Sequence, residues 1–202
     1  MKMKKIVIIA LTPITLLIVL TGYAVITEEY SSYLIRQELT KNYVKEGDKL
    51  CNSGDSKSCY DNGYYYEKEE KDYYAASKYY LKSCNLKHAR GCNALGRYHE
   101  TITKYFFGAF GFYGTSCRLG DGLGCVNTGL LYKNGKPKKD NFMAVQYFKK
   151  ACNLYNGLGC YNLGVMYEQA EGVRQDKQKA KEYYNTACDF QEQLGCDKTR
   201  LQ

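Results

Sequence analysis

The sequence predicts an all-α protein built as a solenoid of helical hairpins. Its ten cysteines fall into five pairs, each pair encloses seven residues, and successive pairs begin 33 to 36 residues apart. Such a period is typical of stacked helix–turn–helix units, which can bury their apolar faces only against neighbouring units. The 22 tyrosines, the lack of tryptophan and the two prolines also favour helices packed through rings over a sheet-rich enzyme.

The N-terminal segment has the layout of an export signal. Lys2, Lys4 and Lys5 precede an apolar run from Ile6 to about Leu20, and small residues allow cleavage after Ala24. Read on to residue 26, the run is long enough to stay as an anchor instead. We therefore expect residues 1–24 to be a signal peptide or an uncleaved N-terminal anchor, and residues 25–202 to form the repeat domain.

The first helix of each unit is predicted to end at the first cysteine of its pair. In the last four units, alanine stands eight residues before that cysteine, two aromatic residues stand five and four before it, and serine or alanine stands directly before it. These positions share one face of a helix. Asp72, Asp140 and Asp176 lie twelve residues before their cysteines and are the predicted N-caps.

A second helix is predicted to follow the second cysteine. Glycine recurs four residues after it, and a ring recurs seven after it; these are Gly63, Gly96, Gly129 and Gly164, with Tyr66, His99, Tyr132 and Tyr167. Glycine inside a helix costs about 1 kcal/mol relative to alanine, so we expect a partner helix backbone to approach it closely. The predicted hairpin units are about 30–67, 68–103, 104–135, 136–171 and 172–202.

Two units depart from the pattern. In the third, Tyr105 replaces the capping aspartate and glycine recurs at 108, 111 and 114, so its first helix is expected to be short, distorted or frayed. A degenerate repeat explains this unit, and the alternative is a ring-rich docking surface of Phe106, Phe107, Phe110 and Phe112. In the first unit, Tyr43 and Ser58 replace the usual alanine and glycine, which suits an N-terminal cap. The last helix is expected to be barely two turns long.

The paired cysteines could be staples, metal ligands or redox pairs. In the stretch C-N-L-Y-N-G-L-G-C, one continuous helix would hold Cys152 and Cys160 about 12 Å apart, whereas a disulfide needs less than about 7 Å, so a glycine-containing turn must bring them together. Zinc would favour Cys-x2-Cys or more histidines than His88 and His99, and a redox pair would favour Cys-x-x-Cys. Disulfides are the favoured interpretation, in the pairs Cys51–Cys59, Cys84–Cys92, Cys117–Cys125, Cys152–Cys160 and Cys188–Cys196.

The charge pattern gives little reason to expect nucleic-acid binding. The formal net charge is +8, and residues 1–24 hold three lysines and no acids, which leaves +5 for the rest. The only dense basic run, Lys136-Pro137-Lys138-Lys139, is interpreted as a solvated loop between helices. Most tyrosines and His99 are expected to pack, and His88 is expected to lie in solvent.

The segment 164–180 resembles the signature G-x-x-Y-x-x-G-x-G-V-x-x-D-x-x-K-A of Sel1-like repeats, relatives of tetratricopeptide repeats, with Ala170 in place of the first loop glycine. The Cys-x7-Cys pairs resemble more narrowly the Helicobacter cysteine-rich proteins, exported Sel1-like proteins with one disulfide per repeat. The resemblance covers about residues 40–202. It implies a right-handed solenoid of disulfide-linked hairpins. No metal or cofactor is expected.

Two functions are then in competition. The resemblance implies a β-lactamase that opens penicillin- or cephalosporin-type rings, but the sequence has no S-x-x-K after the leader and no K-T-G, and Ser83-Cys84-Asn85 fits S-x-N only formally. No catalytic residue is assigned. The favoured prediction is a secreted or periplasmic monomer that binds a peptide, a protein or a cell-wall-derived, penicillin-like ligand on the concave face of the solenoid. Contact with a membrane is expected only if the leader is uncleaved.

Overall fold

The computed structural model describes residues 28–136 and 138–200, so the predicted signal peptide or anchor lies outside the described residues. The chain divides into two compact units, residues 1–43 and 44–202. Within the described residues the secondary structure consists of ten helices and no strand. The helices are α1 (Glu28–Asn52), α2 (Ser56–Lys68), α3 (Tyr73–Asn85), α4 (Ala89–Thr101), α5 (Phe106–Arg118), α6 (Gly122–Lys133), α7 (Asn141–Asn153), α8 (Gly157–Gln169), α9 (Lys177–Asp189) and α10 (Gln193–Arg200).

The predicted N-caps are confirmed. The side chains of Asp72, Asp140 and Asp176 each accept a hydrogen bond of 2.9 Å from the backbone N–H three residues further on. Each bond satisfies one of the N–H groups that a helix start leaves without an internal partner. Tyr105, the N-cap residue of α5, makes no side-chain capping bond.

The prediction of a short or frayed helix in the third unit is wrong. α5 has 13 residues, as α3, α7 and α9 do. The reason is tertiary packing, because Tyr113 and Ala109 of α5 are buried and helix propensity is a weak prior that such packing overrides. Of the phenylalanines expected to form a docking surface, Phe110 and Phe112 pack on buried residues, and Phe107 is exposed.

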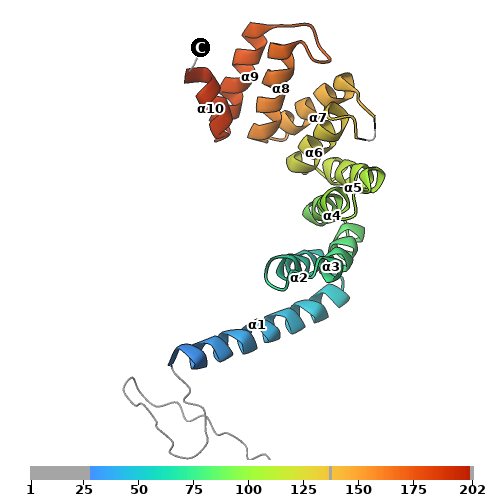
Figure 1. The fold of residues 1–202 in the computed structure, drawn as a ribbon, viewed down its shortest axis with the longest axis vertical. Coiled ribbons are helices and arrows are strands. Elements are labelled where there is room, and N and C mark those ends of the chain that lie inside the picture. Colours follow the sequence, from blue (N-terminus) through green and yellow to red (C-terminus); the bar gives the residue numbers. More distant parts are fainter. Residues whose placement is uncertain (1–27, 137, 201–202) are drawn as a thin grey trace, which may run out of the picture. The chain divides into compact units, whose positions relative to one another are not determined.

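The second unit, residues 44–202, is a succession of antiparallel helices in which each helix packs on the next (Figure 1). Its largest buried side chains are rings from α3, α5, α7 and α9, namely Tyr80, Tyr113, Phe148 and Tyr184. The most extensive core cluster lies around α6, α7 and α8 and includes Val126, Val145, Leu163 and Met166. The last helix, α10, has eight residues, which agrees with the two turns expected.

Five disulfides join the end of each odd-numbered helix to the start of the next helix. The structure pairs the ten cysteines as Cys51–Cys59, Cys84–Cys92, Cys117–Cys125, Cys152–Cys160 and Cys188–Cys196, with Cα–Cα distances of 4.5–4.7 Å. The glycines of C-N-L-Y-N-G-L-G-C do not make the turn, since Gly157 and Gly159 already belong to α8. The chain reverses at Tyr155, whose φ of 58° is left-handed. The equivalent residue is left-handed in all five units: Gly54, Lys87, Gly120, Tyr155 and Gln191.

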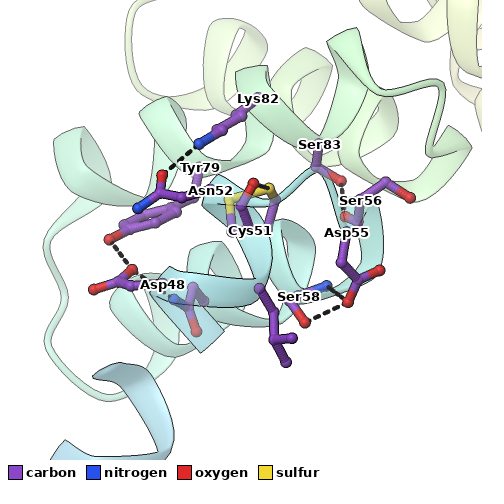
Figure 2. The surroundings of a disulfide bond; sticks show 12 residues. Asp48, Cys51, Asn52, Asp55, Ser56, Ser58, Tyr79, Lys82 and Ser83 are labelled. Carbon is purple, nitrogen blue, oxygen red and sulfur yellow. Dashed lines mark hydrogen bonds between the residues drawn. A yellow bond between two sulfur atoms is a disulfide. The ribbon is translucent and has the colours of Figure 1, made fainter. Parts of the chain in front are cut away.

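Side chains around the first disulfide tie it to α3 (Figure 2). Lys82 donates to the Asn52 side chain at 2.6 Å, and the Ser83 hydroxyl donates to the Ser56 carbonyl at 2.8 Å. Tyr79 donates to Asp48 at 2.5 Å. The bond from Ser83 to the Ser56 carbonyl has an equivalent one unit later, where Ser116 donates to the Ala89 carbonyl at 2.9 Å. The serine before the first cysteine thus links one disulfide turn to the preceding one.

Two kinds of feature are not found in the described residues. No helix there is long and apolar enough to cross a bilayer. No group of three or more histidine, cysteine, aspartate or glutamate side chains is arranged there to hold a metal ion.

Candidate binding face

The repeated glycines of the even-numbered helices are seats for the buried rings. A Cβ atom on Gly63, Gly96, Gly129 or Gly164 would lie 2.5–2.7 Å from a ring carbon of the next helix. Sequence analysis expected a backbone at this position, but the main neighbour is a ring, with the Ala76 and Ala180 carbonyl oxygens behind it at 3.2 and 3.1 Å for Gly63 and Gly164. The contact brings each odd-numbered helix close onto the preceding even-numbered helix.

A tyrosine–glutamate hydrogen bond accompanies three of these four seats. The phenol groups of Tyr80, Tyr113 and Tyr184 donate to Glu67, Glu100 and Glu168 at 2.8–2.9 Å. Burial, together with the neighbouring carboxylate, raises the pKa of all three phenols. The fourth seat holds Phe148, and there Lys133 takes the place of the glutamate and pairs with Glu171 at 3.2 Å. The buried ring and the residue eight positions after the second cysteine therefore change together.

Further rings stack beside each seat. The ring seven residues after the second cysteine is stacked on a ring of the next helix in all four units, with centroids 5.3–5.7 Å apart. The pairs are Tyr66–Tyr79, His99–Phe112, Tyr132–Tyr147 and Tyr167–Tyr183. The expected packing role of His99 is confirmed, and burial lowers the pKa of its imidazole. Because these rings pack on one another, they are poor candidates for a ligand cage.

The even-numbered helices form one layer of the repeat array. Among the described helices, α2, α4, α6 and α8 each contact the next even-numbered helix, whereas odd-numbered helices barely touch one another. Half-exposed side chains one and two positions after the second cysteine lie on these helices: Tyr60, Asp61, Asn93, Asn127, Tyr161 and Asn162. The Asn127 amide donates to Asn93 at 2.8 Å across α4 and α6. We call these six residues the even-helix face.

A hollow of about 410 Å³ adjoins this face at the disulfide turns. It is lined by the first turns of three successive even-numbered helices: Lys57, Tyr60 and Asp61 of α2, His88, Ala89 and Arg90 at α4, and Leu119, Gly120, Asp121 and Gly122 at α6. Three units contribute to one surface here, so a ligand in the hollow would bridge units about 30 residues apart in sequence.

The charges in the hollow are partly compensated. Lys57 pairs with Asp61 at 2.5 Å, and Asp121 accepts hydrogen bonds from Ser116 at 2.7 Å and from the Leu123 N–H. Within residues 28–136 and 138–200, Arg90 makes no ion pair, so its guanidinium adds uncompensated positive charge to the hollow.

His88 differs from its expected position in solvent. It is half-buried, its ring centroid lies 5.3 Å from that of Tyr60, and its Nδ1 atom is buried without a hydrogen-bond partner in the described residues. Burial, followed by the charge of Arg90, lowers the pKa of its imidazole. His88 is therefore neutral at neutral pH and can accept or donate a hydrogen bond.

A second hollow lies at the loop between α8 and α9. Its volume is about 540 Å³, and it is lined by Tyr167, Val173, Arg174, Gln175, Asp176 and Lys179. The loop belongs to the segment that carries the repeat signature, and Asp176 and Tyr167 have structural roles as N-cap and stacked ring. The first hollow is the better candidate site because three units line it and because, within the described residues, Arg90 makes no ion pair and His88 makes no side-chain capping bond.

The serine environments do not resemble an activated nucleophile. The hydroxyls of Ser53, Ser77 and Ser83 donate to backbone carbonyls, and Ser58 and Ser116 bond the capping residues Asp55 and Asp121. An acyl-transfer serine needs a base at hydrogen-bond distance that can take its proton. These serines are instead parts of turns and caps.

The family model of the Sel1 repeat matches residues 53–88, 122–156 and 157–189, a little over half of the chain. The chain therefore belongs to the Sel1 repeat family. Each matched segment holds an even-numbered helix and the odd-numbered helix that follows it: α2 with α3, α6 with α7 and α8 with α9. When the repeats are divided in this way, each disulfide joins two successive repeats. No curated protein matches the chain significantly by sequence.

Several solved structures are similar. Helicobacter pylori cysteine rich protein B is 31% identical, with a TM-score of 0.53, over 65% of this chain and 98% of that protein. A Sel1 repeat protein from Oxalobacter formigenes (24% identity, TM-score 0.70) and c5321, a protective antigen of uropathogenic Escherichia coli (23%, 0.69), each align with 77% of this chain. The chain spans 65% and 35% of the length of these last two, which show the likeness of fold alone.

The even-helix face was missed by sequence reasoning. The residue directly after the second cysteine is Tyr60, Asn93, Val126, Tyr161 or Asp197, and the next is Asp61, Ala94, Asn127, Asn162 or Lys198, so neither position keeps one residue type. The tyrosine–glutamate bond could have been found, because glutamate stands eight residues after the second cysteine wherever the buried ring is tyrosine, and lysine stands there where the ring is phenylalanine.

Proposed function

We propose that this Sel1 repeat protein binds an extended peptide or a segment of a partner protein across the even-helix face. The observation that carries the proposal is the 410 Å³ hollow, which three successive units line and to which Arg90 and His88 contribute side chains that cap no helix. Solenoids use surfaces of this kind for extended ligands.

The chemistry of the face suits a peptide main chain. The Asn127–Asn93 bond uses one polar atom of each amide and leaves the other for a peptide N–H or C=O. Arg90 supplies positive charge beside Tyr60 and a neutral His88. We expect the bound segment to place an acidic side chain or its carboxyl terminus near Arg90. A cell-wall-derived peptide with a free carboxylate fits the same description.

Five disulfides support export, since disulfides persist in oxidising compartments. A secreted or periplasmic location is thus part of the proposal. Hydrolysis of β-lactam rings is the alternative that the resemblance implies, and the serine environments offer it no support. Turnover of a chromogenic cephalosporin by oxidised protein, above a heat-inactivated control, would favour the alternative.

The test is selection of peptides from a displayed library on the oxidised full chain, followed by calorimetry with the selected peptides. The double variant Arg90→Glu, Asn127→Ala should lose about tenfold or more in affinity, since each lost charged or polar contact is worth about 1–3 kcal/mol. The matched control is Lys181→Glu, an exposed charge reversal on α9. Equal affinity of the two variants for every selected peptide would overturn the proposal.

A further inference from the structure

A second surface, unrelated to the even-helix face, lies at the opposite end of the hairpins. α5 and α7 run in the same direction because antiparallel α6 lies between them in the chain, so their N-terminal ends reach the same edge. The loop before α7 lies against the start of α5, since the Lys136 ammonium is 4.8 Å from the centre of the Phe106 ring. We call this surface the basic aromatic edge and define it by Lys104, Tyr105, Phe107, Lys138, Lys139 and Phe142.

The rings of this edge are largely exposed. Phe107 and Phe142 hold the second position of α5 and α7, and they are 66% and 61% exposed; Tyr105 is 56% exposed. None of these three rings lines any of the hollows described in the second unit. Tyr105 also contacts the His99 ring edge to face, with centroids 5.8 Å apart, whereas Phe107 and Phe142 lie at helix starts, a position that suits insertion into a soft surface better than docking in a shaped groove.

The charge of the edge is positive. Lys104, Lys138 and Lys139 are exposed. The nearby acidic groups are already engaged: Asp140 caps α7, Glu171 pairs with Lys133, and Glu100 accepts the hydrogen bond of Tyr113. Residues 101–107 contain no acidic residue. Exposed rings beside uncompensated lysines match the interfacial region of an anionic bilayer, where aromatic side chains sit at headgroup level and lysines meet anionic lipids.

We propose that the basic aromatic edge docks the solenoid on an anionic lipid surface, with Phe107 and Phe142 inserted at headgroup depth. This departs from the sequence-based interpretation of residues 136–139 as a solvated loop. The contact would be peripheral and would act whether or not the predicted leader is cleaved. It involves none of the residues of the proposed peptide site, so the two proposals can fail separately.

The chain lacks tryptophan, so a single introduced tryptophan reports on one place alone. In the oxidised full chain, Phe107→Trp should shift its emission to shorter wavelength and lose accessibility to iodide on phosphatidylcholine vesicles that contain phosphatidylglycerol. Vesicles of phosphatidylcholine alone should have little effect. The matched control is Tyr155→Trp, at an 80% exposed position of the turn at the opposite end of α7, where neither change is expected.

Charge variants separate this edge from any binding by the N-terminal apolar run. In the Phe107→Trp background, Lys138→Gln with Lys139→Gln should weaken by about thirtyfold the vesicle partition that the indole fluorescence reports. Lys149→Gln with Lys150→Gln removes the same charge at the far end of α7 and should change the partition little. Two outcomes would overturn the proposal: equal spectral shifts in the Phe107→Trp and Tyr155→Trp proteins, or an indole at position 107 that responds to duplex DNA and not to anionic vesicles.

Discussion

At the scale of single residues, glycine has two opposite effects on the stability of this chain. At Gly96 a Cβ would lie 2.5 Å from a ring carbon of Tyr113, so only glycine lets the ring lie against the helix. At Gly111 of α5 no atom lies within 4 Å of an added Cβ, so nothing in the fold requires glycine there. The first glycine gains packing at the expense of helix propensity, whereas the second only lowers the propensity.

Replacing Gly111 by alanine should therefore stabilise the protein. We expect the free energy of unfolding to rise by up to about 1 kcal/mol, because alanine favours the helix and lowers the conformational entropy of the unfolded chain. Urea unfolding of the oxidised chain, followed by circular dichroism, measures the change.

The companion variant Gly96→Ala should have the opposite sign. Its methyl group would meet the buried Tyr113 ring, and overpacking of this kind costs about 1–3 kcal/mol. Stabilisation of both variants would show that the glycine seat is not a close contact.

The tyrosine–glutamate bond can be tested at Tyr184, whose phenol donates to Glu168 at 2.8 Å while Lys198 also donates to that carboxylate. Tyr184→Phe keeps the buried ring and removes the bond, so the free energy of unfolding should fall by about 1 kcal/mol. Tyr155→Phe removes an exposed hydroxyl and serves as the control. The bond has no role in stability if the two variants unfold at the same urea concentration.

At the scale of helices, the sequence predicts most of the second unit because the same few contacts recur. The small, aromatic and capping positions around each cysteine pair define both helices, and the structure places the caps and buried rings accordingly. The expectation for α5 is wrong because it treats three glycines as local helix breakers. The stability of α5 comes instead from the seat on Gly96 and from buried Ala109 and Tyr113, which a count of propensities does not contain.

The candidate sites were harder to predict for a different reason. The hollow combines side chains of three units at positions that do not repeat, such as Tyr60 and Arg90, and their proximity depends on the packing of α2, α4 and α6. The basic aromatic edge was partly visible in sequence, since Phe107 was named among the candidate docking rings. Phe142 belongs to the next unit, and only the packed structure brings the loop before α7 against the start of α5.

The disulfides should differ in how much of the chain is destabilised when each is removed. Removing Cys117–Cys125 by two alanine substitutions should cost roughly 2–3 kcal/mol, because both cysteines are buried beside the central core and the bond holds the glycine-rich α5 against α6. Removing Cys188–Cys196 should mainly release the short α10, since that helix has no following neighbour in the described residues. Hydrogen exchange read by mass spectrometry distinguishes the two cases. Equal loss of protection throughout the chain in both variants would contradict this expectation.

At the scale of the whole second unit, stability accumulates along a row of neighbouring interfaces, as expected for a repeat protein. Three of these interfaces, α2–α3, α4–α5 and α8–α9, contain the same buried phenol hydrogen-bonded to a carboxylate. A condition that ionises these phenols therefore acts on several interfaces at once. High pH is such a condition, and its effect should be cooperative.

Burial first, and then the adjacent glutamates, raise the pKa of Tyr80, Tyr113 and Tyr184 above the usual value near 10. A group whose pKa is higher in the folded state contributes stability that is complete below its unfolded pKa and declines as pH rises above it. Stability should thus be steady up to about pH 10 and fall beyond it. Phenolate absorbance at 295 nm should show exposed tyrosines ionising first, with helix intact. The buried three should ionise later, together with Tyr79, whose pKa is also raised by burial and by Asp48, and with loss of helical circular dichroism. In Tyr184→Phe the alkaline decline should be shallower, because one of the three phenols is gone. A single titration near pH 10 with full helicity would mean that the phenols are not buried as described.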